Sequence, residues 1–175
     1  MPAAEERALL VVLGGLPGTG KSTLASALGE RLGAMHIRID TIEQAMRDAG
    51  QTIAVPGGCL GAGGVARGYL RLGVAVIVDA VNPVAYTREL WQEVAAATGA
   101  RLVEIELVCG DSAEHRRRVE SRTVDIDGFR LPTWQDVLDR GYEPWRTAEV
   151  VDTAGTSVEE VEEALAEVVR RGRLD

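Results

Sequence analysis

A glycine-rich stretch near the start of the chain carries the residue types that bind phosphate. The residues GLPGTGKS, numbers 15–22, have the spacing G-x-x-x-x-G-K-[ST] and lie between an expected strand and an expected helix. Glycines let the backbone turn so tightly that its N–H groups point at anionic oxygens, and the following helix adds the positive end of its dipole. In this pattern Lys21 reaches the β- and γ-phosphates of a nucleotide, and the Ser22 hydroxyl ligates Mg²⁺.

We therefore expect this loop to bind a nucleoside triphosphate, ATP, together with Mg²⁺. The competing interpretation is a glycine-rich turn that carries a surface lysine. The end of the last expected strand should lie beside the loop, where its backbone groups can frame the adenine. The residues expected to hold the nucleotide are Gly15, Pro17, Gly18, Thr19, Gly20, Lys21, Ser22, Thr23, Asp152 and Thr153.

Three of the expected strands end in an aspartate, namely Asp40, Asp79 and Asp152. In open α/β sheets ligands bind beyond the carboxyl ends of the strands, so these side chains are expected near the phosphate-binding loop. Phosphoryl transfer to a hydroxyl group needs a carboxylate that accepts the hydroxyl proton, and Asp40 is the candidate. The alternative is that Asp40 caps the helix TIEQAMR; the two roles are compatible.

Asp79 and the arginines near the aspartates have open interpretations. The Asp79 carboxylate either reaches Mg²⁺ beside Ser22, as in a Walker-B-like arrangement, or belongs to the site of the phosphate acceptor. Arg38 and Arg47 are candidates to hold an anionic group of the substrate or to steady Asp40. Arg88 either pairs with Asp79 or points into the cleft, and a solvated arginine is the default alternative.

Basic residues gather in the segment 111–146, which is the expected lid. Arg118 and Arg122 are four residues apart and share a helix face, so both can neutralise the transferred phosphate and help to exclude water. Arg116, Arg117 and Arg130 compete for these roles, and a solvated basic face is the alternative. The following sequence, DIDGFRLPT, is polar with Gly and Pro, which is typical of a mobile lid tip.

Apolar segments of two kinds alternate along the chain. Short β-branched runs at 8–14, 35–40, 74–80, 102–108 and 148–153 indicate strands, and helical patterns lie between them. The last pattern, SVEEVEEALAEVVRR, opens with Ser157 and Glu160 at capping-box spacing. This alternation predicts one α/β domain, residues 1–175, whose parallel sheet is covered on both faces. The glycine-dense stretch 56–64 is either a flexible wall of the acceptor pocket or a surface loop.

The composition restricts the function classes. The net charge of −8 disfavours a protein whose main role is to bind nucleic acid, although it leaves room for a small positive pocket. The two cysteines, Cys59 and Cys109, form no metal-type pair, which fits a reduced, cytoplasmic setting. The chain begins with acidic residues followed by an apolar run that is too short to span a bilayer, so no membrane association is expected.

The motifs GLPGTGKST, IRIDTIEQAM, VIVDAVNP, RVESR and VVDT together resemble the small P-loop kinases. This family includes chloramphenicol phosphotransferase, zeta-type toxins, gluconate kinase and the kinase domain of polynucleotide kinase. The resemblance implies a five-stranded parallel sheet of order 2-3-1-4-5 with flanking helices and an arginine-bearing lid. It also implies Asp40 as catalytic base, Lys21 and Ser22 on phosphate and magnesium, and Arg118 and Arg122 as lid arginines.

The function that these residues predict is an ATP-dependent phosphotransferase. Its acceptor is expected to be a hydroxyl group of a small molecule, such as a metabolite or an antibiotic. One alternative is a polynucleotide kinase acting on 5′-hydroxyl ends, which the acidic balance disfavours. Another is a P-loop hydrolase or switch without an acceptor, which Asp40 and the lid arginines fit less well.

Overall fold

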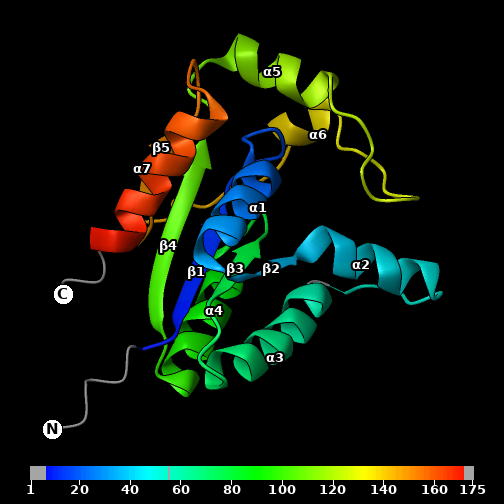
Figure 1. Cartoon of the computed structure of the whole chain (residues 1–175). Helices are drawn as coiled ribbons and strands as arrows, with labels where there is room; N and C mark the ends of the chain where they lie inside the picture. The colour runs from blue at the N-terminus through cyan, green and yellow to red at the C-terminus, as the bar shows by residue number, and fades with distance from the viewer. Residues whose placement is uncertain (1–6, 55, 172–175) are drawn as a thin grey trace, which may run out of the picture.

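The computed structural model describes residues 7–54 and 56–171 and shows a central sheet with helices on both faces (Figure 1). The ends of the predicted domain 1–175, and Val55 in front of the glycine-dense stretch, lie outside the described residues. All pairings in the sheet are parallel, and its order β2-β3-β1-β4-β5 confirms the expectation. The strands are β1 (Leu9–Gly14), β2 (Met35–Arg38), β3 (Val76–Asp79), β4 (Arg101–Val108) and β5 (Glu149–Asp152).

Helices connect the strands and cover the sheet. Helices α1 and α7 pack on one face, and α3 and α4 pack together on the other (Figure 1). Helices α5 and α6 lie in the lid, beyond the carboxyl ends of the strands (Figure 1). The helices are α1 (Lys21–Leu32), α2 (Ile39–Asp48), α3 (Gly57–Arg71), α4 (Ala85–Thr98), α5 (Ser112–Glu120), α6 (Trp134–Leu138) and α7 (Val158–Arg171).

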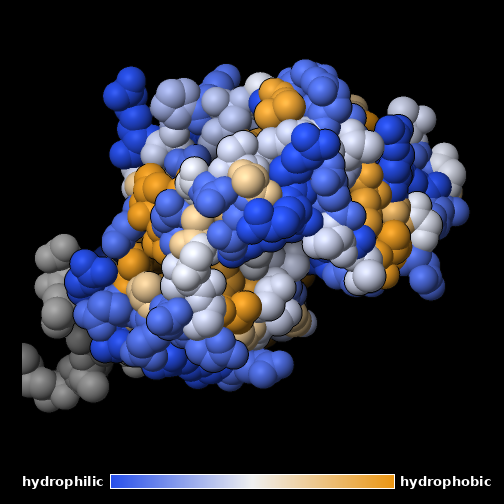
Figure 2. All heavy atoms as spheres, turned by 90° about the horizontal axis from the view of Figure 1, so that it is seen from above, coloured by the Kyte–Doolittle hydropathy of each residue, from blue (hydrophilic) through white to orange (hydrophobic). Residues whose placement is uncertain are grey.

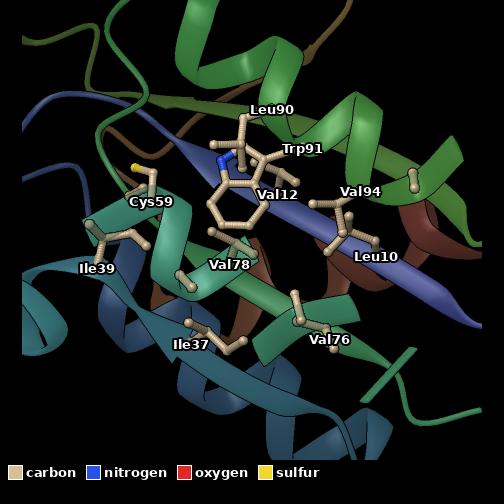
Figure 3. Packing of buried hydrophobic residues seen from close by; sticks show 14 of the residues in the cluster. Leu10, Val12, Ile37, Ile39, Cys59, Val76, Val78, Leu90, Trp91 and Val94 are labelled. Carbon is tan, nitrogen blue, oxygen red and sulfur yellow. The ribbon is translucent and has the colours of Figure 1, made fainter. Parts of the chain in front are cut away.

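The apolar run of β1 is continuous because both of its faces are buried. Leu10 and Val12 point into the cluster around Trp91 of α4, as Figure 3 shows. Leu9, Val11 and Leu13 point to the opposite face, against α1 and α7. Since successive side chains of a strand point to opposite faces, one strand supplies residues to both hydrophobic cores. The sheet is thereby fixed between two helical layers, and its carboxyl edge forms a rigid base for the site.

The glycine-dense stretch 56–64 is not the loop that the sequence indicated. Gly57 begins α3, and the helix is continuous to Arg71. Its glycines allow close packing, because a Cβ on Gly63 would lie 3.2 Å from Leu90 of α4. Cys59 on the same helix is buried in the core. Tertiary packing overrides the low helix propensity of glycine here, and the stretch does not line the main cavity.

The second strand is shorter than the sequence indicated. Arg38 is the last extended residue, and Ile39 already begins α2. Asp40 therefore lies in the first turn of the helix and does not close the strand. A carboxylate there is favoured by the positive end of the helix dipole.

Candidate active site

A cavity of about 920 Å³ lies at the carboxyl edge of the sheet. The phosphate-binding loop and the start of α1 form its floor, and α2, the lid and the start of α7 form its walls. Figure 2, viewed from above, shows that the surface at this end of the molecule is mainly hydrophilic. The cavity brings together the four residues predicted to act in catalysis: Asp40, Lys21, Arg118 and Arg122.

The phosphate-binding loop needs glycine at two positions for steric reasons. Gly15 has φ +134°, and a Cβ there would lie 2.2 Å from the carbonyl oxygen of Leu107 in β4. Gly18 has φ +86°, and a Cβ there would lie 2.5 Å from Val119 of the lid helix α5. Gly15 thus serves packing and does not line the cavity, whereas Gly18 does. The loop is also tied to the lid, because His115 Nε2 lies 2.8 Å from the Pro17 carbonyl oxygen.

Lys21 opens α1 and is buried in the floor of the cavity. Its Nζ donates a hydrogen bond to the Leu16 carbonyl, at 2.8 Å. Burial lowers the pKa of Lys21 to about 8, although the negative charges of Asp79 and Asp40 act in the opposite direction. Burial therefore disfavours the charged form of this lysine, and the negative charge of a bound phosphate group would favour it.

Ser22 and Asp79 present hard oxygen atoms side by side. Asp79 ends β3, is only 4% exposed, and its Oδ2 has no hydrogen-bond partner among the described residues. Burial acts to raise the pKa of Asp79, but His36, Lys21 and the Ser22 hydroxyl outweigh it and hold that pKa below the ordinary value. Asp79 Oδ2 faces His36 and Arg38 at 3.6 and 3.7 Å. An ionised carboxylate beside a hydroxyl fits Mg²⁺, which takes one or two protein oxygens and completes its shell with phosphate and water.

No larger metal cluster competes with this pair. Across residues 7–54 and 56–171, no group of three or more His, Cys, Asp or Glu side chains is arranged to hold a metal ion. His36 was not expected to take part in the site, but its Nε2 lies 3.6 Å from Asp79 Oδ2. The sequence gives no sign of this contact, since it depends on the pairing of β2 with β3.

Asp40 faces the same cavity from α2. It is half-buried, and within the described part of the chain its carboxylate makes no hydrogen bond or ion pair. Burial and the negative charge of Asp79 raise the pKa of Asp40, while Lys21, Arg38 and Arg122 act against the rise. A free carboxylate with a raised pKa is better suited to accept a proton than an ordinary one.

The arginines of the lid fall into two groups. Arg118 is held in place, because it donates to the hydroxyl and carbonyl oxygens of Thr153 and pairs with Glu114. Arg122 and Arg140 line the cavity and have no ion-pair partner among the described residues. Both are close enough to influence the pKa of Lys21. Arg140 was missed by the sequence analysis because it has no motif spacing and reaches the cavity only through the fold of the lid.

The two arginines on the α2 side have partners within the protein. Arg38 forms a forked ion pair with Asp125 of the lid, at 2.5 Å and 3.3 Å, and its Nε lies 3.7 Å from Asp79. Arg47 pairs with Glu43 one turn earlier on α2, at 3.1 Å. Both arginines line the cavity as predicted, but neither guanidinium is without a counter-ion.

Two predicted site residues have other positions. Arg88 is buried, donates to the backbone carbonyls of Asn82, Glu143 and Pro144, and does not line the cavity. Asp152 is exposed outside the cavity, and its carboxylate accepts hydrogen bonds from the N–H groups of Gly110 and Ala154. Both side chains satisfy backbone groups: Arg88 lies outside the cavity in which it was expected to bind substrate, and the Asp152 side chain does not reach the cavity. Thr153, which follows Asp152, lines the cavity as predicted.

Comparison with solved structures gives the same fold. An APS kinase from Mycobacterium tuberculosis, solved with AMPPNP and APS, is 18% identical with a TM-score of 0.68, and the match covers 94% of this chain and 98% of that one. A gluconokinase from Sinorhizobium meliloti is 21% identical with a TM-score of 0.68 and covers 95% and 93%. At these identities the comparison shows the fold alone, which is that of the P-loop kinases.

Comparison of sequences identifies the family of the chain. An uncharacterized protein of Mycobacterium tuberculosis is 46% identical over 48 residues, and the match covers 27% of this chain but only 10% of that protein. No helix in the described part of the chain is long and apolar enough to cross a membrane. A model of the AAA domain matches residues 10–140, well over half of the sequence. The chain therefore belongs to the AAA domain family and has the fold of the small P-loop kinases.

Proposed function

We propose that the protein transfers the γ-phosphoryl group of ATP to a hydroxyl group of a small molecule. The observation that carries this proposal is the position of Asp40. Its unpaired carboxylate lines the same cavity as Lys21 and the phosphate-binding loop. Transfer to a hydroxyl group needs a proton acceptor beside the transferred phosphate, and the unpaired carboxylate of Asp40 supports that role.

In the proposed reaction, the oxygen of the acceptor hydroxyl forms a bond to the γ-phosphorus as the bond to the β,γ-bridging oxygen breaks, and ADP leaves. Asp40 accepts the hydroxyl proton. Lys21 and Arg122 neutralise charge on the transferred group, and Arg140 adds positive charge from the lid. Ser22 and Asp79 would hold Mg²⁺, and when the ion is bound its positive charge offsets the negative charge of the phosphates. The lid covers the cavity and reduces the access of water.

The comparisons support nucleotide binding without indicating the acceptor. The APS kinase in that fold was solved with AMPPNP and APS, so the fold can hold a nucleotide and a second small molecule together. The gluconokinase supports a kinase with a different acceptor on the same fold. We therefore place ATP over the phosphate-binding loop and the hydroxyl compound between Asp40 and the lid loop, 123–132.

The test is a screen of hydroxyl compounds, including 5′-hydroxyl oligonucleotides, for acceptor-dependent formation of ADP and of the phosphorylated product. We expect Asp40→Asn to lower transfer by about 10²–10⁴-fold, because a general base contributes about this much. Its affinity for ATP should stay within a few-fold of the wild type, since Asp40 does not bind the phosphates. Asp48→Asn, with the same charge change at the other end of α2, is the control and should transfer normally.

Two results would contradict the proposal. Transfer by Asp40→Asn at the wild-type rate would remove Asp40 as the base. Steady ATP hydrolysis that no hydroxyl compound stimulates, and that Asp40→Asn does not change, would favour the hydrolase instead.

A further inference from the structure

The cavity has two ends that differ in how their charges are balanced. The nucleotide end holds Arg122 and Arg140, whose guanidinium groups have no ion-pair partner among the described residues. The acceptor end, which we define as the part between α2 and the lid loop 123–132, holds Arg38 and Arg47, and both are paired. The nucleotide end can thus accept an anion from outside, whereas Arg38 and Arg47 at the acceptor end already have protein carboxylates as partners.

The pair between Arg38 and Asp125 is the main contact across the acceptor end. The two terminal guanidinium nitrogens of Arg38, Nη1 and Nη2, contact the two carboxylate oxygens of Asp125, which is the forked geometry that a substrate carboxylate, sulfate or phosphate would use. The arginine side chain is only 14% exposed, so little of it is left for another partner. The hydrogen bond from Arg38 lowers the pKa of Asp125, so this carboxylate stays ionised at neutral pH.

The rest of the acceptor end does not favour an anion either. Asp40 and Asp79 are both near Arg38, so an incoming anion would meet three carboxylates once Asp125 is counted. The lid loop is also in close contact with α2, since a Cβ on Gly128 would lie 3.1 Å from Gln44 Nε2. Arg130 is the remaining cation of this end, and it is exposed to solvent on the lid loop. The buried cation of the acceptor end, Arg38, therefore holds a protein carboxylate, whereas Arg130, unpaired among the described residues, is exposed to solvent.

We propose that Asp125 occupies the anion-binding position at Arg38, so that the phosphate acceptor is an uncharged hydroxyl compound and not a carboxylated, sulfated or phosphorylated one. This inference rests on the proposed phosphotransfer for the identity of the reaction. The occupancy of Arg38 can nevertheless be tested without any reaction. Asp125 is thus a specificity-determining residue, and removal of its charge opens the position to an external anion.

The first experiment measures sulfate binding while the nucleotide end is filled. The protein is saturated with Mg²⁺ and AMPPNP, and its melting temperature is followed against sodium sulfate, with sodium chloride of equal ionic strength as the reference. We expect Asp125→Asn to bind sulfate at least about tenfold more tightly than the wild type. The matched control is Asp127→Asn, because Asp127 lies on the same loop, outside the cavity, and its side chain has no partner among the described residues.

Three outcomes of this titration would overturn the inference. If the wild type binds sulfate as tightly as Asp125→Asn does, an external anion readily displaces Asp125 from Arg38. If Asp125→Asn gains no sulfate binding, Arg38 is not an anion-binding position. If Asp127→Asn gains as much sulfate binding as Asp125→Asn, the loss of any negative charge on the lid loop is enough to increase sulfate binding.

The second experiment uses pairs of acceptors that differ only in one group, such as a polyol and the corresponding aldonic acid. We expect the wild type to have the higher kcat/KM for the neutral member, and Asp125→Asn to shift that ratio toward the acid by about tenfold. A wild type that prefers the acid would overturn the inference. Transfer to neither member of any pair would count against the phosphotransfer itself, and the sulfate titration would still decide the role of Asp125.

Discussion

A substitution of Arg88 tests whether this side chain stabilises the fold or binds the substrate. The residue is 4% exposed, and its guanidinium donates to the carbonyls of Asn82, Glu143 and Pro144 at 2.9, 2.6 and 2.9 Å. It also stacks over the rings of Tyr142 and Trp145, at 5.0–5.2 Å from their centroids. Arg88 thereby fixes the segment that connects the lid to β5, and we expect Arg88→Met to loosen that connection.

The magnitude follows from the groups that the substitution leaves unpaired. Met fills much of the volume but leaves one buried and two partly buried carbonyl oxygens without a donor, and an unpaired buried acceptor costs about 1–3 kcal/mol. Because a loosened segment can recover some hydrogen bonds with water, the lower part of that range applies, and we expect a total loss of about 3–5 kcal/mol. In a chain of this size this corresponds to a fall in melting temperature of roughly 6–20 °C.

The assay is urea unfolding followed by tryptophan fluorescence, with the midpoint and the slope fitted separately. Arg146→Met is the control, because Arg146 is exposed on the same segment, and it should change the free energy of unfolding by less than about 0.5 kcal/mol. If Arg88→Met unfolds at the wild-type urea concentration but has a raised KM for the acceptor, our structural interpretation is refuted. The original expectation of a substrate-binding arginine would then be correct.

Two further predictions concern the site and the loop that forms it. The raised pKa of Asp40 implies that transfer falls with decreasing pH at a higher pH than for an ordinary carboxylate of pKa about 3.9, because only the ionised form accepts a proton. A carboxylate whose pKa is raised on folding destabilises the folded state at pH values above that pKa, so Asp40→Asn should raise the free energy of unfolding at neutral pH. An unchanged free energy of unfolding, together with a kcat that stays constant down to about pH 4, would contradict both expectations. Gly18→Ala should cost about 1–2 kcal/mol through its positive φ and more through the contact with Val119, and it should weaken nucleotide binding. Urea unfolding of Gly18→Ala with and without Val119→Ala separates the two parts, and no coupling between the substitutions would show that Val119 does not limit the loop.

The fold could be predicted from local signals because most of it is built locally. Apolar runs of strand length, the glycine at the end of α1 and the capping box of Ser157 and Glu160 all describe neighbouring residues, and each is found in the structure. The glycine-dense first half of α3, up to Gly64, could not be predicted in the same way. Its glycines oppose a helix locally, and only the packing of Gly63 against Leu90 of α4 reveals why they are there.

The site residues likewise differ in whether their contacts are local in the sequence. The phosphate-binding loop is one continuous stretch, so Lys21, Ser22 and their neighbours were found by spacing. Arg88 was expected to bind substrate because its position after a strand-end aspartate resembles that of a site residue, but it lies outside the cavity. Its partners Glu143 and Pro144 are more than fifty residues away in the sequence. A buried arginine that satisfies carbonyls and one that binds substrate have the same sequence signal.

This difference explains why likeness of fold says more about the nucleotide than about the acceptor. The nucleotide contacts that we propose would depend on the backbone geometry of one continuous loop. The contacts of the proposed acceptor would depend on pairs such as Arg38 and Asp125, which are 87 residues apart and belong to β2 and the lid. One substitution or insertion in the lid would replace Asp125 without changing the fold. Solved structures that are 18–21% identical to this chain therefore show its fold and do not indicate the charge of the acceptor that we propose.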